Sequence, residues 1–303
     1  MLPGGSENTA SDDLRQLTPH GAAPLTLRGT AGPLAALDTG PGNRGTVLMV
    51  AGFTGTKEDF APLLAPVARA GWRVVVVDQR GQYQSPGPDD PAAYTVELLA
   101  ADVVEVGHQL RGDGPLHLLG HSFGGIVARA AVLAEPGLFA SLTLLSSGPV
   151  GLTGPRADLL EHLAPLLEAG GVRLVHDTLE QLSLTDPRSA AVPAPVREFL
   201  ATRFLANTEA GLTGMAAAMT GEPDRTAELA ATGVPVLVAH GADDDAWTPT
   251  AQTDMAARLG ARHVVLDGAA HSPAIETPAA TIGALTGFWS AVPAVSDAQE
   301  ASA

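Results

Sequence analysis

The sequence predicts an α/β fold in which an open, twisted, mostly parallel β-sheet carries helices on both faces. Six short apolar runs lack polar–apolar alternation, which is typical of strands that are buried on both faces. Segments with helical periodicity separate most of these runs. Strand–helix alternation of this kind implies right-handed crossovers between parallel strands.

Each expected strand is an apolar run that ends in a glycine or a polar residue. The six runs are TVLMVAGF at 46–53, WRVVVVDQRG at 72–81, PLHLLGHS at 115–122, SLTLLSSG at 141–148, VPVLVAHG at 234–241 and ARHVVLDG at 261–268. Before them, LTLRGT and PLAALDTG, between Leu25 and Gly40, are candidates for a leading antiparallel pair.

The expected helices follow from apolar stripes and from capping signals. Stripes at helical spacing run over residues 60–67, 99–110 and 282–289. Thr248-Pro249 and Thr277-Pro278 each place a capping hydroxyl before a proline that suits a first helical turn.

One long stretch breaks this rhythm, because residues 151–229 contain helix-like pieces but no strong strand signal. A bare loop of this length is uncommon in a compact domain, so we expect a helical cap over one end of the sheet. The core would then comprise residues 23–150 and 230–294. The polar segments 1–22 and 295–303 are expected to be flexible.

Composition limits the possible partners. The chain has 303 residues, with 17 basic and 33 acidic side chains and a formal net charge of −16. This charge repels phosphate backbones and anionic lipids, so neither nucleic acid nor a membrane is expected as a partner. Cysteine is absent, which excludes disulfides and a cysteine nucleophile. No apolar run approaches the roughly 18 residues that span a bilayer, and no secretory signal is recognisable, so we expect a cytoplasmic protein.

The clearest chemical signal is Gly120-His121-Ser122-Phe123-Gly124, a G-x-S-x-G pattern between a strand and a helix. A serine on such a tight turn projects from the edge of the sheet, and the glycines relieve crowding around it. We therefore expect Ser122 to be a nucleophile. The alternative is a glycine-rich joint with an incidental serine.

A serine nucleophile needs a base, and the chain has nine histidines. His271 follows the last strand and can face the same edge as the serine. His240, at the end of the preceding run, is the main competitor. His117 and His263 lie inside strand runs, where packing is the expected role, and His121 is expected to be architectural.

A third group must orient the base, and the loop after VPVLVAHG offers three carboxylates: Asp243, Asp244 and Asp245. Adjacent residues point in different directions, so we expect one of them to reach His271. Alternatively, all three cap the following helix. The backbone N–H groups of Phe123 and Phe53 are the expected donors to an oxyanion. Phe123 directly follows Ser122, and Phe53 follows Gly52, which lets the backbone approach closely.

Together, four motifs resemble the α/β-hydrolase superfamily. They are GHSFGG at 120–125, H-G-x-x-D at 240–244, G-x-x-H-S-P at 268–273 and DQRGQYQS at 78–85. The chain order Ser, Asp, His is also that of the family. The resemblance implies an eight-stranded, mostly parallel sheet with a helical cap after the sixth strand. It also implies Asp244 as the acid, with Asp245 as the fallback.

The chain departs from the family pattern near two turns. Ala51 stands where many relatives have histidine, and Tyr83 stands where they have glycine. Tyr83 is expected either to line the pocket mouth or to pack beside it. Asp78 and Arg80 are expected to pair with each other and brace their turn.

The cap and the nearby loops should supply the pocket. Candidate lining residues are Tyr83, Trp247, Met215 and Met219, although core packing is an alternative for the two methionines. Four arginines could bind a substrate carboxylate or form surface ion pairs: Arg173, Arg188, Arg197 and Arg203.

These residues predict a serine hydrolase that cleaves a small-to-medium, largely apolar carboxylic ester through an acyl-enzyme. The superfamily also contains lactone, amide and C–C bond hydrolases and perhydrolases, and a low-turnover ligand-binding protein could keep the same scaffold. No histidine–carboxylate cluster has metal-ligand spacing, so no metal or other cofactor is expected. The partner is a small-molecule substrate, and the sequence leaves the oligomeric state open.

Overall fold

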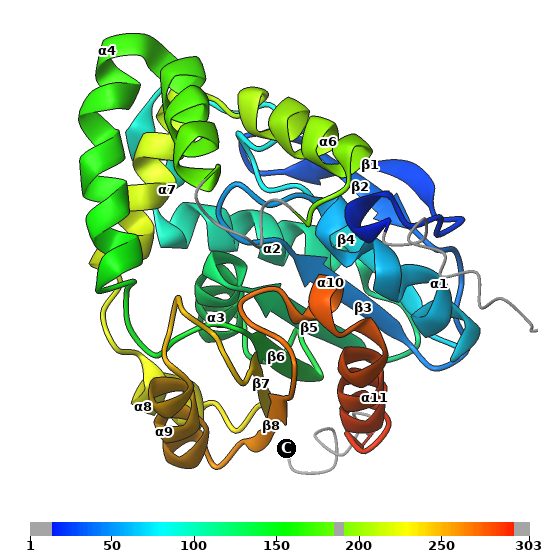
Figure 1. The fold of residues 1–303 in the computed structure, drawn as a ribbon. Coiled ribbons are helices and arrows are strands. Elements are labelled where there is room, and N and C mark those ends of the chain that lie inside the picture. The colour runs from blue at the N-terminus through cyan, green and yellow to red at the C-terminus, as the bar shows by residue number, and fades with distance from the viewer. Residues whose placement is uncertain (1–13, 185–190, 294–303) are drawn as a thin grey trace, which may run out of the picture.

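A computed structural model describes residues 14–184 and 191–293 and contains an eight-stranded sheet in the order β1-β2-β4-β3-β5-β6-β7-β8 (Figure 1). The strands are β1 (Ala23–Gly29), β2 (Gly32–Asp38), β3 (Thr46–Val50), β4 (Arg73–Val77), β5 (Leu116–His121), β6 (Ser141–Leu145), β7 (Val236–Gly241) and β8 (Arg262–Leu266). The pairs β1–β2 and β2–β4 are antiparallel, and the other neighbouring strands of the described sheet pair in parallel. The predicted α/β class and the leading antiparallel pair are confirmed.

The central strands are buried because their side chains alternate between two apolar cores. In β3, Leu48 and Val50 belong to one core, whereas Val47 and Met49 belong to the other, and all four are fully buried. A strand with this environment gains from an apolar residue at every position, which explains its unbroken run in the sequence.

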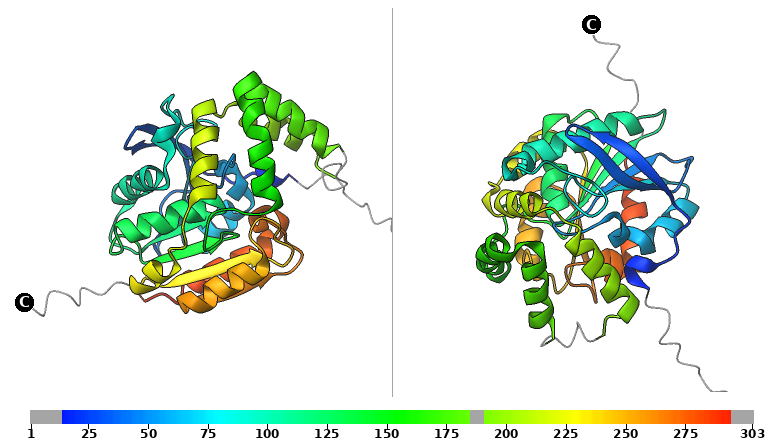
Figure 2. Two further views of the ribbon diagram at one scale, coloured as in Figure 1. Left: turned by 90° about the vertical axis from the view of Figure 1, so that its left-hand side faces the viewer. Right: turned by 90° about the horizontal axis from the view of Figure 1, so that it is seen from above.

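Helices cover both faces of the sheet. One core receives side chains from α2 (Val96–Leu110), α3 (Phe123–Ala134) and α9 (Pro249–Leu259). The opposite core receives them from α1 (Ala61–Arg69), α10 (Pro273–Glu276) and α11 (Pro278–Trp289). Short 3-10 helices complete the connections: η1 (Arg15–Leu17), η2 (Lys57–Phe60) and η3 (Pro91–Tyr94). Figure 2 shows this arrangement from two further directions.

The helical insertion after the sixth strand is present. Three of its helices, α4 (Pro155–Ser183), α6 (Ala194–Leu205) and α7 (Glu209–Gly221), lie together at one end of the sheet (Figure 1). A further helix of the insertion, α8 (Thr226–Ala231), instead packs against α9 and α3. Residues 226–229, which were expected to belong to the cap, therefore pack on the core instead. Leu229 is apolar and is buried in the same core as side chains of α3 and α9.

Helix α4 is divided by a kink. Gly171 has φ 67° and ψ −168°, which is outside the helical region and in a part of conformational space that favours glycine. Because of this break, the two parts of α4 can follow different directions over the sheet end.

Residues 14–22 differ from the loose segment expected from their composition. The helix η1 packs against η2, α1 and α6, and the Gln16 amide donates to the Asp59 carboxylate at 3.0 Å. The remainder of the expected N-terminal segment, residues 1–13, and the expected tail 295–303 lie outside the described residues. Within residues 14–184 and 191–293, no helix combines the length and the apolar character needed to cross a bilayer.

Candidate active site

Ser122 lies on the sharp turn between β5 and α3, in a backbone conformation that costs energy. Its φ of 55° and ψ of −125° are unusual for a residue with a side chain. The neighbouring glycines are sterically required: a Cβ at Gly120 would lie 2.2 Å from the Gly124 carbonyl oxygen, and one at Gly124 would lie 2.5 Å from that of Ala51. The turn thus combines a strained backbone at Ser122 with close packing of the neighbouring glycines, which holds the serine at the edge of the sheet.

The structure brings Ser122, His271 and Asp244 together at the carboxyl ends of β5, β7 and β8. The Ser122 hydroxyl donates to His271 Nε2 at 3.0 Å, and His271 Nδ1 donates to Asp244 Oδ1 at 2.9 Å. This arrangement can move a proton away from the hydroxyl while the carboxylate stabilises the imidazolium that forms.

Asp244 is a buried carboxylate with a full set of donors. Oδ1 also accepts from the Ala246 N–H at 3.0 Å, and Oδ2 accepts from the Gln252 amide at 3.0 Å. Burial by itself raises the pKa of the Asp244 carboxyl, but the hydrogen bond and charge of His271, together with the other two donors, lower it to about 2. The carboxylate therefore stays ionised at neutral pH. The local sequence gives no signal that Gln252, a glutamine on α9, contacts this loop, so the role of Gln252 was not predicted.

The other carboxylates of the loop do not face the imidazole. Asp243 is exposed, and Asp245 pairs at the surface with Arg156 at 2.6 Å. The structure therefore brings Asp244, the acid implied by the family resemblance, against His271, and directs its neighbours elsewhere.

Two other candidate histidines contact groups away from the hydroxyl. His240 Nε2 lies 2.9 Å from His263 Nε2, and His240 Nδ1 lies 2.8 Å from the Gly241 carbonyl oxygen. His121 instead donates from Nε2 to the main-chain oxygen of His271 at 2.7 Å. Burial, followed by the charge of His271, lowers the pKa of His121 to about 4, so this ring is neutral at pH 7.

The proposed oxyanion donors lie beside the nucleophile. A Cβ at Gly52 would lie 2.9 Å from the Ser122 Cβ, which shows how closely the loop before Phe53 approaches. Phe123 is the first residue of α3, where N–H groups lack helical partners. Within the described residues, neither the Phe53 N–H nor the Phe123 N–H donates to an intramolecular acceptor. Both are therefore free to bind a substrate oxygen.

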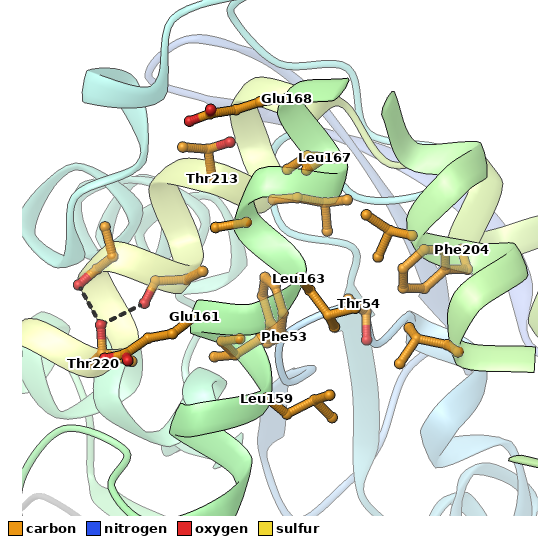
Figure 3. A pocket seen from close by; sticks show the side chains of 17 residues that line it. Phe53, Thr54, Leu159, Glu161, Leu163, Leu167, Glu168, Phe204, Thr213 and Thr220 are labelled. Carbon is orange, nitrogen blue, oxygen red and sulfur yellow. Dashed lines mark hydrogen bonds between the residues drawn. The ribbon is translucent and has the colours of Figure 1, made fainter. Parts of the chain in front are cut away.

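Two adjoining cavities lie under the cap. The catalytic cavity, of about 350 Å³, is lined by Ser122 and His271 together with Trp247 and Met219. The second, of about 400 Å³, is lined mainly by apolar side chains of α4 and α7 (Figure 3). The cavities share four lining residues: Phe53, Thr54, Leu159 and Leu160.

The other two expected pocket residues line neither of these cavities. Met215 is buried in one of the two apolar cores, on a helix that packs against η3 and α2. Tyr83 packs edge-on against Phe199, and the Lys57 ammonium lies 4.8 Å from its ring centroid. At these two positions the structure therefore shows the packing alternatives, core packing for Met215 and packing against neighbouring side chains for Tyr83, and not pocket lining.

The expected ion pair between Asp78 and Arg80 is wrong. Lys57 binds Asp78 at 2.8 Å through its ammonium group, whereas Arg80 binds Asp102 on α2. The two side chains leave the turn toward opposite faces of the sheet, where η2 and α2 supply separate buried partners. Burial of Asp78 raises its pKa to about 6, despite the opposing effect of Lys57.

The four cap arginines have different environments. Arg203 lines the catalytic cavity and pairs with Asp59 at 2.5 Å. Arg173 is exposed, and Arg197, also exposed, donates to the Val192 carbonyl. Arg188 lies outside the described residues.

Comparisons with known proteins show the family to which this fold belongs. A family profile described as "alpha/beta hydrolase fold" matches residues 45–278. The sn-1-specific diacylglycerol lipase ABHD11 of Mus musculus is 30% identical over 161 residues, which cover 52% of this chain and 51% of the lipase. A non-heme chloroperoxidase of Streptomyces lividans is 28% identical over 221 residues, covering 68% of this chain and 77% of that protein.

Solved structures give a fuller match. A hydrolase from Pseudomonas aeruginosa PA01 superposes with a TM-score of 0.74 and 29% identity, covering 88% of this chain and 97% of that one. The first three curated relatives are matched over only 40%, 41% and 51% of their own lengths. The similarity therefore extends over the whole fold but leaves the substrate open.

Proposed function

The chain belongs to the alpha/beta hydrolase fold family, and on that premise we propose that it is a serine hydrolase that cleaves a small-to-medium, largely apolar carboxylic ester. The observation that carries the proposal is the continuous hydrogen-bonded chain from the Ser122 hydroxyl through His271 to Asp244. The hydrolases and lipases among the compared proteins support the reaction class.

In the first half-reaction, Ser122 Oγ attacks the ester carbonyl carbon while His271 Nε2 accepts the hydroxyl proton. The carbonyl oxygen becomes an oxyanion that accepts hydrogen bonds from the N–H groups of Phe53 and Phe123. The ionised Asp244 stabilises the imidazolium. Collapse of the tetrahedral intermediate breaks the bond to the alcohol oxygen, which takes the proton from His271 and leaves an acyl-serine.

In the second half-reaction, water takes the place of the alcohol. His271 accepts a proton from this water as it attacks the acyl carbon, and the same two N–H groups bind the oxyanion again. Collapse of this second intermediate breaks the bond to Ser122 Oγ, which recovers its proton from His271. The products are the carboxylic acid and the alcohol, with the enzyme restored.

An ester fits the surroundings because the second cavity is mainly apolar, part of the wall of the catalytic cavity is apolar, and an ester carbonyl needs no charged partner. The wall near Ser122 includes Leu152, Leu160 and Trp247. Apolar substrate surface that is buried against such walls stabilises the complex by about 25 cal/mol per Å² removed from water.

The test combines covalent labelling with turnover. The wild-type protein should react stoichiometrically with a fluorophosphonate at the Ser122 peptide and should hydrolyse p-nitrophenyl esters. Ser122→Ala should lose both properties while its circular dichroism spectrum stays unchanged. Labelling at another residue, or full turnover by the Ala variant, would refute the assignment.

A ligand-binding protein on the same scaffold predicts a different result, namely saturable binding of esters without turnover. A substrate panel tests ester hydrolysis against lactone and amide hydrolysis. Lactones, amides and p-nitrophenyl esters are compared at equal concentration, and the esters should give the highest kcat/KM.

A further inference from the structure

The cavity between α4, α6 and α7 is separate from the groups that carry out the reaction. It has a volume of about 400 Å³ and contains neither Ser122 nor His271. Its deepest side chains, Leu163, Val175 and Leu212, are all at least nine-tenths buried. Such an apolar chamber is suited to a hydrocarbon group.

We propose that this chamber binds the acyl chain of the substrate, and that it selects medium-chain acyl groups of roughly eight to twelve carbons. The inference rests on the proposed function and adds which part of the ester the chamber binds and how long that part is. Four lining residues, Phe53, Thr54, Leu159 and Leu160, are common to the chamber and the catalytic cavity, so a chain attached at Ser122 can continue into it.

The position of His271, the proposed base, indicates that the chamber binds the acyl chain of the ester and not its alcohol group. The leaving oxygen must lie within reach of the His271 imidazole in order to be protonated. Of the two cavities, His271 and Trp247 line only the catalytic one, whereas the residues common to both are Phe53 and Thr54 with Leu159 and Leu160 of α4. With the alcohol toward His271, the acyl group points past Phe53 into the chamber.

The charges around the two cavities agree with this orientation. The catalytic cavity has polar walls at Gln16, Asp59 and Arg203, which suit a polar alcohol better than a long alkyl group. The exposed Glu161 and Glu168 are the charged residues of the chamber. A chain that ends in a methyl group is therefore preferred over one that ends in a second carboxylate.

The volume of the chamber limits the length of the acyl chain that it can hold. A methylene occupies roughly the share of space of one water molecule in the liquid, about 30 Å³, so a chamber of about 400 Å³ holds on the order of ten carbons at incomplete filling. Each methylene that leaves water should improve kcat/KM about three- to fourfold until the chamber is full.

The test is a series of p-nitrophenyl esters with acyl chains from acetyl to palmitoyl. For the wild type, kcat/KM should rise to a maximum at the medium-chain esters and then decline. Ala216→Trp places a bulky side chain on the chamber wall of α7 and should lower medium-chain kcat/KM at least about tenfold, with acetyl-ester turnover nearly unchanged. Ala257→Trp, at an exposed position on α9, is the matched control and should keep the wild-type profile.

A binding measurement separates this inference from the proposed reaction. The inactive Ser122→Ala variant should bind decanoate, and the double variant with Ala216→Trp should bind it at least about tenfold more weakly. If short esters are hydrolysed with no preference for chain length and Ala216→Trp changes nothing, the chamber assignment is wrong and the proposed function stands. If decanoate binds as expected but no ester is hydrolysed, the proposed function fails and the chamber assignment stands.

Discussion

His121 Nε2 donates a hydrogen bond of 2.7 Å to the main-chain oxygen of His271, so the histidine next to the nucleophile holds the loop that carries the proposed base. The ring also packs edge-on against Phe60. Its pKa of about 4 keeps it neutral, with the proton on the nitrogen that faces the carbonyl. We therefore propose that His121 is a positioning residue for His271.

His121→Ala should lower kcat about ten- to a hundredfold with a smaller effect on KM, because a small displacement of the base is costly for proton transfer. Fluorophosphonate labelling of Ser122 should slow in parallel. His108→Ala, at an exposed site paired with Glu135, is the control and should retain wild-type rates. Equal rates in both variants would remove the positioning role.

His271→Ala should reduce kcat/KM for a p-nitrophenyl ester by at least about four orders of magnitude, since Ser122 then has no base. His240→Ala should cost only a few-fold, because His240 contacts His263 rather than the hydroxyl. Steady-state kinetics on both variants check this prediction. A comparable loss in His240→Ala would mean that the wrong histidine has been identified as the base.

Asp244→Asn should lower kcat by about 10³- to 10⁴-fold, because the amide cannot stabilise the imidazolium and can impose the wrong tautomer on it. Asp245→Asn loses only a surface ion pair with Arg156, and Asp243→Asn alters an exposed side chain, so both should stay near wild-type activity. The three variants form a matched set from one loop. The ranking of their kcat values identifies the acid.

Gly52→Ala should lower kcat strongly while leaving the fold intact, because the new Cβ would lie 2.9 Å from the Ser122 Cβ and displace the Phe53 N–H. Gly221→Ala adds the same methyl group at a position with no heavy atom within 4 Å of the built Cβ, apart from local neighbours, and should be nearly silent. Thermal unfolding of both variants separates a catalytic effect from loss of stability. Equal kcat in the two would argue against a donor at Phe53.

The free energy of unfolding should fall as the pH drops below about 6.5, and His117 contributes to this decline. Burial lowers the pKa of His117 to about 4, while its unfolded value is near 6.5. Between these pH values the unfolded chain takes up a proton that the folded protein excludes, so acid favours unfolding.

His117→Gln should show a smaller loss of unfolding free energy than the wild type between about pH 7.5 and pH 4.5, measured by urea denaturation. The absolute stability of the variant is expected to be lower, because the imidazole packs against Trp72 and hydrogen-bonds to Ser141. The comparison of slopes is therefore the informative one. An unchanged pH dependence would contradict the prediction.

Local patterns predicted the strands, the elbow at Ser122 and the insertion because each is specified by residues close together in the sequence. The unbroken run of β3 reflects burial on both faces, and the glycines around Ser122 reflect a turn that side chains would block. The order Ser, Asp, His then narrowed the site to a few loops.

The errors concern contacts between distant segments. Lys57 and Asp102 bind the two charges that were expected to pair with each other, and both lie on elements whose position depends on the whole fold. Gln16 reaches Asp59 through an N-terminal helix too short to give a periodic signal. Packing of α8 against α9 likewise depends on where the insertion returns to the sheet.

Phe53 has two separable roles in the proposed reaction, because its N–H is the expected oxyanion donor and its side chain lines both cavities. Every amino acid except proline supplies the same N–H. Exchanging this one side chain could therefore retune acyl selectivity while leaving the reaction chemistry in place. Substitutions at position 53 should therefore change the substrate range, in natural divergence and in directed evolution alike, without removing a donor from the reaction.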